Sequence, residues 1–449
     1  MSVSAPAPAA PRTVAATPLP VLGDDVLVPV ADGTEVTYAA LDQAASAPVL
    51  RRVWDDVAAY LPYYGSVHRG SGHLSQLSTD LYERSRATVA AFLGCRADDQ
   101  VVFTRGTTDS LNLLAAVVPD GTRVFVFESE HHAALLPWRR CETTVLDTPR
   151  SPQQAVSVLE AALHGGPDGP KLVCVTGASN VTGEIWPVRE LARVAHRHGA
   201  RVVLDAAQLA PHHPVDVAGL DVDWVAFSGH KLYAPFGAGV LAGRSDWFDA
   251  AEPYLAGGGA SRRVAREPDG GLDVAWRTGT ARHEAGSPNV VGAYAVASAC
   301  RALAEAGLEG LVRRERALLE VLLDGLAQVP EVRVLSLFGR GEDGGQGRGE
   351  GGRAAGRVGV VSFVVDGWDG TEFADALSAE YGIGVRSGLF CAHPLLRNLL
   401  GRRHDEDGDC GAPSEGALNA VRVSFGAGTP DEHVERFVRA VRTLARRRS

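Results

Sequence analysis

The sequence predicts an α/β protein built around a largely parallel sheet. From about residue 100 onward, short apolar runs alternate with stretches in which apolar residues recur at helical spacing. Several of the short runs are apolar on both faces, which is typical of strands that helices cover from both sides. We expect strands at 100–106, 123–129, 171–177, 201–207, 222–229 and 237–243.

Each remaining element has its own local signal. Residues 186–199 predict a helix, because Pro187 stands near its start, apolar residues recur at helical spacing, and Gly199 marks its end. A long amphipathic helix is expected at 308–330. After it the chain predicts strands at 357–365, 382–386 and 420–426, with a helix at 371–382. The final helix opens with Thr429, Pro430 and Glu432, the pattern of a capping box with proline in the first position.

These elements suggest a division into domains. Residues 1–30 are expected to form a disordered tail rich in Ala and Pro, and 31–300 a large domain whose N-terminal part also packs on the small domain. Residues 301–449 are expected to form a smaller C-terminal domain. Gly-rich or charged insertions near 339–357 and 402–416 should be flexible loops.

Composition excludes several classes of protein. The formal net charge of −10 argues against a general nucleic-acid-binding surface. No apolar run approaches the length that spans a bilayer, and the start of the chain lacks a signal-peptide pattern. The six cysteines form no C-x-x-C pair and no zinc-ligand spacing, so we expect a reduced, cytoplasmic protein without a metal site.

Lysine is scarce, and this makes Lys231 informative. Of the 44 basic residues, only Lys171 and Lys231 are lysines, and the other 42 are arginines. Lysine alone offers a primary amine that can lose its proton and form a Schiff base. Lys171 opens an apolar run and is expected to be a surface charge, whereas Lys231 follows a predicted strand.

Ligands of open α/β sheets bind at the carboxyl ends of the strands, and polar residues follow four of the predicted strands. Thr107 and Thr108 stand after Gly106 at a helix start, where backbone amides and hydroxyls suit a phosphate, although threonine is also an ordinary helix cap. Asp205 follows a buried strand, and Gln208 comes three residues later. A protonated pyridine nitrogen would stabilise this carboxylate, although a helix cap is an equal alternative.

The other two strand ends carry histidines. Ser228 and His230 precede Lys231 and could reach a phosphate, while the glycines after them allow close backbone approach. His131 and His132 follow the strand at 123–129, and an imidazole there could stack on a flat ring or simply cap a helix. Together, a phosphate site, a carboxylate for a ring nitrogen, a stacking histidine and a lysine are the parts that a pyridoxal-phosphate site requires.

Seven motifs in order along the chain resemble the class V aminotransferase family, most closely its cysteine desulfurase and selenocysteine lyase branch. The resemblance extends upstream to 41–48 and 67–75 and so covers most of the chain from about residue 40. The motifs are RGTT at 105–108, EHHA at 130–133, ASNVTGE at 178–184, DAAQ at 205–208, SGHKLYAPFGAG at 228–239, EAGSPN at 284–289 and VRSGLFCAHPLL at 385–396.

The resemblance implies pyridoxal 5'-phosphate as cofactor, the fold of type I enzymes with a seven-stranded sheet, and a homodimer with active sites at the subunit interface. Lys231 would form the Schiff base and His131 would stack on the ring. The resemblance also implies that Asp205 pairs with the ring nitrogen, Gln208 with the ring hydroxyl, Asn180 with ring and substrate, Arg422 and Arg386 with the substrate, and Thr107, Thr108, Ser228, His230 and the partner subunit's Ser287 with the phosphate.

Cys391 aligns with the nucleophile of the desulfurases. After the lysine removes the Cα proton, a thiolate must attack the sulfur of L-cysteine and carry it away as a persulfide, leaving alanine. This branch usually has two histidines directly before the cysteine, whereas Leu389 and Phe390 stand there in this chain. An apolar setting of this kind would blunt the reactivity of the thiol.

Three functions therefore remain open from the sequence. The first is a cysteine desulfurase-like enzyme that uses a Cys391 persulfide and passes the sulfur to an acceptor protein. The second is a class V aminotransferase, epimerase or C–S lyase that acts on another amino acid without that cysteine. The third is a non-catalytic binding scaffold, which the presence of Lys231, Asp205 and His131 argues against.

Overall fold

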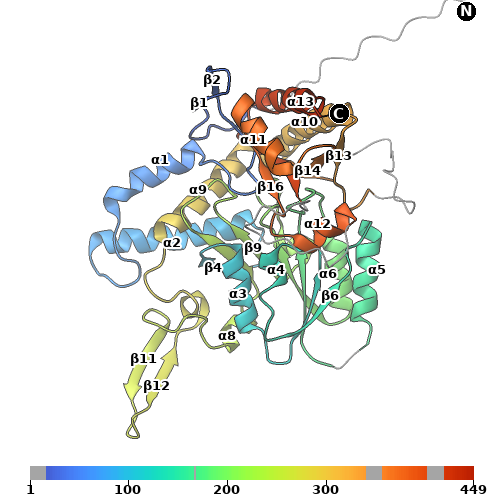
Figure 1. Ribbon diagram of the computed structural model, residues 1–449. Coiled ribbons are helices and arrows are strands. Elements are labelled where there is room, and N and C mark those ends of the chain that lie inside the picture. The colour runs from blue at the N-terminus through green and yellow to red at the C-terminus, as the bar shows by residue number, and fades with distance from the viewer. Residues whose placement is uncertain (1–16, 166–167, 340–355, 402–418, 449) are drawn as a thin grey trace, which may run out of the picture.

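The computed structural model describes residues 17–165, 168–339, 356–401 and 419–448, and a seven-stranded sheet forms its centre (Figure 1). Five neighbouring strands are parallel, and β10 runs antiparallel to both of its neighbours. The α/β fold with a mainly parallel sheet, expected from the sequence, is confirmed. In spatial order the strands are β4 (Gln100–Thr104), β10 (Gly239–Gly243), β9 (Trp224–Ser228), β8 (Ala200–Asp205), β7 (Lys171–Thr176), β5 (Arg123–Phe127) and β6 (Glu142–Leu146).

Helices cover both faces of this sheet, which explains why its strands are apolar at successive positions. In β8, Val202 packs in the cluster that contains α5 (Pro152–Leu163) and α6 (Val188–Arg197), whereas Val203 packs in the cluster that contains α3 (Thr107–Val117). Side chains of a strand alternate between faces, so burial on both faces requires an unbroken apolar run. The short helix α4 (His132–Leu135) lies on the α3 face.

A second, antiparallel sheet lies at one end of the molecule, in the upper part of Figure 1. Three of its four strands share one apolar cluster with three helices and with Ala39 and Leu41 from the N-terminal part of the chain. The strands are β13 (Val332–Val334), β14 (Val360–Val365), β17 (Ala420–Ser424) and β16 (Arg386–Gly388), and the helices are α10 (Leu308–Ala327), α11 (Gly370–Tyr381) and α13 (Asp431–Ala445). The short strands β3 (Ala39–Ala40) and β15 (Ile383–Gly384) pair in parallel beside it.

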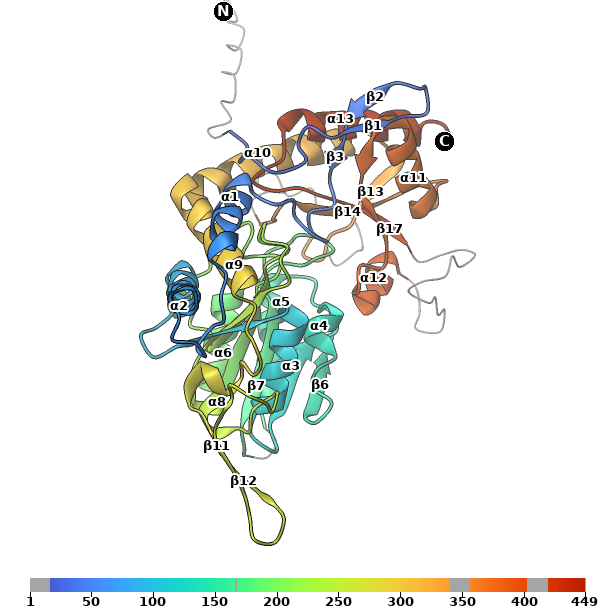
Figure 2. The same ribbon diagram turned by 90° about the vertical axis from the view of Figure 1, so that its left-hand side faces the viewer.

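The remaining elements flank the two sheets. The hairpin of β11 (Ser261–Arg266) and β12 (Leu272–Trp276) extends away from the rest of the chain (Figures 1 and 2). Helix α9 (Val290–Ala306) runs through the domain boundary expected at residue 300 and ends before Gly307, whose φ is +81°. The others are α1 (Arg51–Tyr60), η1 (Leu61–Tyr63), α2 (His73–Phe92), α7 (Val217–Leu220), α8 (Asp246–Ala250), η2 (Gly279–Arg282) and α12 (His393–Leu400).

Two local expectations differ from the structure. Residues 17–30 do not continue the tail: Val21 is buried, the amide of Leu19 donates to the carbonyl of Ala427 (2.8 Å), and β1 (Leu27–Pro29) pairs with β2 (Glu35–Thr37). The capping box at α13 is also absent. The hydroxyl of Thr429 instead accepts hydrogen bonds from Gln43 and from the amide of Gly426.

Parts of the sequence predictions lie outside the described residues. These are the first part of the tail, at 1–16, and nearly all of the two insertions, at 340–355 and 402–418. Among the helices that the structure describes, none combines the length and the hydropathy needed to cross a bilayer.

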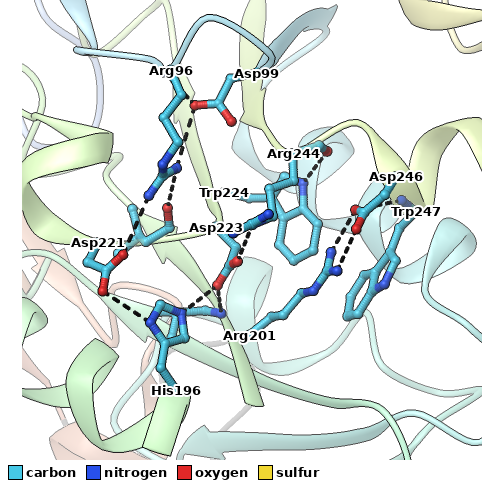
Figure 3. A network of polar contacts seen from close by, with 12 residues as sticks. Arg96, Asp99, His196, Arg201, Asp221, Asp223, Trp224, Arg244, Asp246 and Trp247 are labelled. Carbon is cyan, nitrogen blue, oxygen red and sulfur yellow. Dashed lines mark hydrogen bonds and ion pairs between the residues drawn. The ribbon is translucent and has the colours of Figure 1, made fainter. Parts of the chain in front are cut away.

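A network of polar contacts lies at the amino ends of β8 and β9 (Figure 3). Asp223 accepts hydrogen bonds from Nε2 of His196 (2.9 Å), the amide of Val202 (2.8 Å) and Nε of Arg244 (2.7 Å). His196 also lies 3.2 Å from the carboxylate of Asp221 through Nδ1. Burial alone would raise the pKa of Asp223, but these hydrogen bonds and charges lower it. The same contacts, led by the bond to Asp223, raise the pKa of His196.

Candidate active site

The candidate site begins where α3 starts, beside the end of β9. The amide and the hydroxyl of Thr107 each lie 2.8 Å from Oγ of Ser228, so the two predicted phosphate positions are in direct contact. Thr108 is exposed on the same turn. A Cβ on Gly239 would lie only 2.4 Å from Cα of Gly106, so the backbones of β10 and of this turn approach closely because residue 239 is glycine.

Lys231 and Asp205 form the charged centre of the site. Asp205 ends β8, is 5% exposed, and accepts a hydrogen bond from the amide of Ala207 (2.9 Å). Burial raises its pKa, against the opposing effects of that bond and of Lys231. Burial also lowers the pKa of Lys231 to about 8, although Asp205 opposes the change. A share of the amine is therefore uncharged and nucleophilic at neutral pH.

His131 and Gln208 are held in place by the elements around them. Nδ1 of His131 accepts a hydrogen bond from the amide of Ala133 (3.0 Å) and so caps α4. Burial, and next the charge of Lys231, lower the pKa of His131 to about 3, so its ring is neutral. Gln208 is buried and donates from Nε2 to the carbonyl of Ala44 (2.8 Å).

His230 lies beside Lys231. Its carbonyl accepts a hydrogen bond from the amide of Ala47 (2.9 Å). Burial, and then Lys231, lower the pKa of its ring, which is therefore neutral and half-buried next to the turn that carries the lysine.

Arg422 is buried in β17 and is incompletely bonded. Its Nη2 donates to Oδ1 of Asp42 (2.9 Å) and its Nη1 to the carbonyl of Asn180 (3.1 Å). Its Nε is buried and finds no hydrogen-bond partner among the described residues. The ring of Phe390 lies 5.0 Å from the guanidinium carbon. A buried guanidinium with a free donor can accept a carboxylate from a ligand.

The loop that carries Cys391 has an unusual backbone. Phe390 and Cys391 both have a φ of +53°, in the left-handed region that residues other than glycine rarely adopt. Neighbouring segments hold this conformation: Nδ2 of Asn180 donates to the carbonyl of Phe390 (2.7 Å), and the amide of His132 donates to the carbonyl of Cys391 (2.8 Å). The side chain of Cys391 is exposed.

Cys391 opens onto a cleft of about 460 Å³. Its sulfur is close enough to Lys231 and to Arg422 to affect the pKa of both groups. The residues around the cleft are Thr108, Asn112, His131, His132, Ala133, Leu136, Pro137, Arg139 and Cys391.

Comparison with known proteins fits this arrangement. The family model described as aminotransferase class V matches residues 39–437. The chain belongs to the class V aminotransferase family. It is 32% identical to a cysteine desulfurase of Pectobacterium atrosepticum, over 92% of this chain and 94% of that protein. It is 33% identical to a probable cysteine desulfurase of Mycolicibacterium paratuberculosis, over 90% of this chain but only 55% of that longer relative.

Solved structures agree with the fold. An apo cysteine desulfurase of Thermococcus onnurineus has a TM-score of 0.76 and 33% identity, over 91% of this chain and 95% of that one. A cysteine desulfurase of Escherichia coli has a TM-score of 0.73 and 31% identity, over 91% and 94% of the two chains. The fold is therefore that of the type I pyridoxal-phosphate enzymes.

Class V aminotransferases depend on pyridoxal 5'-phosphate, and the residues present fit this group. The structure supplies a partly buried lysine with a lowered pKa, a buried carboxylate at the next strand end, and a neutral imidazole. It also supplies hydroxyls and a helix start that suit a phosphate. These groups come from separate strand ends, as the sequence predicts.

Two other predicted residues are exposed. Arg386 is exposed on β16, where it pairs in register with Arg422. The two side chains carry like charges, so Arg386 helps to lower the pKa of Arg422, after the larger effect of burial. Ser287 is exposed on the loop before α9 and does not line the cleft.

Two contacts around Arg422 were not foreseen from the sequence. Asp42 lies in the motif at 41–48, yet its ion pair with Arg422 spans 380 residues, and no local pattern predicts it. The ring of Phe390 at the guanidinium is equally unexpected, because sequence position alone identified Phe390 only as a neighbour of the thiol.

Proposed function

We propose that this protein is a pyridoxal-phosphate enzyme of the cysteine desulfurase type, which takes sulfur from L-cysteine, leaves alanine, and carries the sulfur on Cys391. The observation that supports this most directly is the position of the thiol. Cys391 is exposed at the cleft, and its sulfur lies within electrostatic reach of both Lys231 and Arg422.

Several residues would hold the cofactor in this proposal. Lys231 would bind its aldehyde, Asp205 its ring nitrogen, and Gln208 its ring hydroxyl, while His131 would cover the ring as a neutral imidazole. Thr107, Thr108, Ser228 and His230 would bind its phosphate. When bound, the cofactor withdraws electrons from the α-carbon of the amino acid.

The substrate would be oriented by the second sheet. The free donor of Arg422 would bind the α-carboxylate of the amino acid, while Asn180 would keep the Cys391 loop beside it through the carbonyl of Phe390. Arg386, exposed on the neighbouring strand, would help to attract the carboxylate.

The reaction would then use two groups of this chain. The amine of Lys231, with a pKa lowered to about 8, would take the proton from the α-carbon as a general base. The thiolate of Cys391 would attack the sulfur of the substrate, so that an S–S bond would form as the Cβ–S bond breaks. The electron pair of the broken bond would stay with the carbon part, which would take up a proton and leave as alanine. We propose further that the enzyme is a cytoplasmic homodimer in which Ser287 of each subunit reaches the phosphate of the other, and that an acceptor protein removes the sulfur.

Product analysis with L-cysteine tests the proposal. With a reductant present, the wild-type enzyme should release alanine and sulfide in equal amounts. Cys391→Ser should lower sulfide release by at least about 100-fold while the yellow absorbance of the cofactor remains, because serine cannot accept sulfur. Lys231→Ala should lose both the turnover and the cofactor absorbance that depends on the amine.

Cys141→Ser is the matched control, since Cys141 is also a free cysteine but lies outside the cleft. If Cys391→Ser turns over L-cysteine like wild type, the persulfide route is wrong, and a C–S lyase, aminotransferase or epimerase replaces it. A wild-type protein that cannot be loaded with cofactor would contradict the whole proposal.

A further inference from the structure

Two histidines from different parts of the chain meet beside the Cys391 loop. The rings of His132, at the start of α4, and His393, at the start of α12, have centroids 4.5 Å apart with an interplanar angle of 63°. We call them the His132–His393 pair. Leu389 and Phe390 directly precede Cys391, so the imidazoles nearest to this loop in the sequence come from His393 and, across the fold, from His132.

The pair is tied directly to the cysteine. The amide of His132 donates to the carbonyl of Cys391 (2.8 Å), and His393 follows Cys391 by only two residues. His132 and Cys391 also line the same cleft. The bond to His132 fixes the left-handed backbone at Cys391, and the exposed thiol therefore keeps its place relative to α4.

Both rings are shifted toward their uncharged form. Burial lowers the pKa of His132, and His393 lowers it further; burial and then Arg397 lower the pKa of His393. Among the neighbouring groups, His131 is neutral, and Arg139, which also lines the cleft, is cationic. The rings are therefore uncharged at neutral pH, and an uncharged imidazole is the form that acts as a base.

We propose that His132 takes the thiol proton of Cys391, and that His393 is a positioning residue that acts through its ring contact with His132. In this step the S–H bond of Cys391 breaks, an N–H bond forms on His132, and the sulfur keeps the electron pair. No oxidation or reduction occurs. The thiolate is then ready for the reaction proposed above, on which the purpose of this step rests.

Alkylation of Cys391 by iodoacetamide tests the pair, because only the thiolate reacts. The rate should be followed against pH by mass spectrometry of the Cys391 peptide, in the apo protein and in the cofactor-loaded protein. His132→Gln should slow alkylation at pH 7 by about tenfold and move the half-maximal rate to higher pH by about one unit. His393→Gln should have a smaller effect in the same direction.

The chain offers a matched control. His164 and His198 form a similar T-shaped pair with centroids 5.8 Å apart, next to the amino ends of β7 and β8 and away from the cleft. His164→Gln should leave the pH profile unchanged. If His132→Gln and His393→Gln both retain the wild-type profile, the proposal is wrong.

A second measurement covers the case in which a variant does not fold. The NMR titration of His132 should differ between the wild-type protein and Cys391→Ser, in which both histidines are retained, and an unchanged titration would also contradict the proposal. Neither experiment needs a substrate. A protein that fails to release sulfide from L-cysteine would therefore overturn the proposed function, while the alkylation profile would still decide the role of the pair.

Discussion

The surroundings of the charged residues differ between the two ends of the central sheet. At the amino ends, hydrogen bonds to Asp223 and His196 favour their charged forms (Figure 3). At the carboxyl ends, burial disfavours the charged forms of Asp205 and Lys231. Glu130, which is fully buried near Asp205, shows the same effect, because burial and then Asp205 raise its pKa well above the usual value.

This difference in hydrogen bonding indicates which buried charges stabilise the fold and which need a ligand. A carboxylate with several donors contributes to folding, whereas a buried charge without enough partners costs free energy unless a ligand supplies them. Glu130 makes the point: Oε1 accepts from the amide of Thr176 (2.9 Å), but Oε2 finds no partner among the described residues. Among the described residues, Glu130 at the carboxyl ends thus keeps one unbonded buried oxygen, whereas both carboxylate oxygens of Asp223 at the amino ends accept hydrogen bonds.

The largest effect on stability is expected when the hydrogen bonds to Asp223 are removed. Asp223→Ala removes a buried acceptor from Val202, His196 and Arg244, and should lower the free energy of unfolding by about 3 kcal/mol. Urea unfolding at neutral pH would measure this. Turnover per folded molecule should not change, since the site lies at the opposite strand ends. A loss below about 1 kcal/mol would show that the network contributes little.

A smaller effect is expected when the carboxylate of Asp205, at the carboxyl ends of the strands, is made neutral. In apo protein, the raised pKa of Asp205 means that its ionisation opposes folding above the ordinary aspartate value of about 4, so Asp205→Asn should be at least as stable as wild type at pH 7. Cofactor affinity should fall by about 30-fold, equal to about 2 kcal/mol, because a charge-assisted hydrogen bond is lost.

Thermal melts of the apo proteins and absorbance titrations with pyridoxal 5'-phosphate would measure these two quantities. If Asp205→Asn melts well below wild type and binds the cofactor equally well, then Asp205 stabilises the fold and does not bind the cofactor, contrary to our prediction.

The smallest effect is expected in the pH dependence of stability. Because the folded pKa of His196 is raised, its contribution is complete below the unfolded value of about 6.5 and is lost as the pH rises through the folded pKa. The difference in unfolding free energy between wild type and His196→Gln should thus be greatest near pH 6 and should shrink toward pH 9. Partial exposure of His196 keeps it small. A difference that grows with pH would contradict the sign.

Sequence patterns located this sheet well because its strands are buried on both faces. Five of the seven strands are apolar runs of the kind that local patterns identify, and β10 is marked by its glycines. The edge strand β6 was missed, since Glu142–Leu146 is mostly polar and exposed on its open side. The positions of Lys231, Asp205 and Thr107 followed from one rule, that the ends of neighbouring strands meet.

Contacts between distant segments could not be predicted in this way. The ion pair of Asp42 with Arg422 and the burial of Val21 both depend on how the N-terminal part of the chain packs against the second sheet. Thr429 likewise looks like a helix cap from its neighbours alone, but Gln43 from the far end of the chain bonds its hydroxyl. Local patterns carry no information about such partners.

The backbone conformation at Phe390 and Cys391 determines whether the local sequence alone can place the thiol. Two successive residues in the left-handed region disfavour this shape by roughly 1 to 2 kcal/mol each, so a peptide of residues 389–392 would not adopt it alone. The shape is imposed from outside, by Asn180 and by His132. The position of the sulfur thus depends on the whole fold. If residues 389–392 were grafted onto another protein without these two partners, the backbone would not take up this conformation.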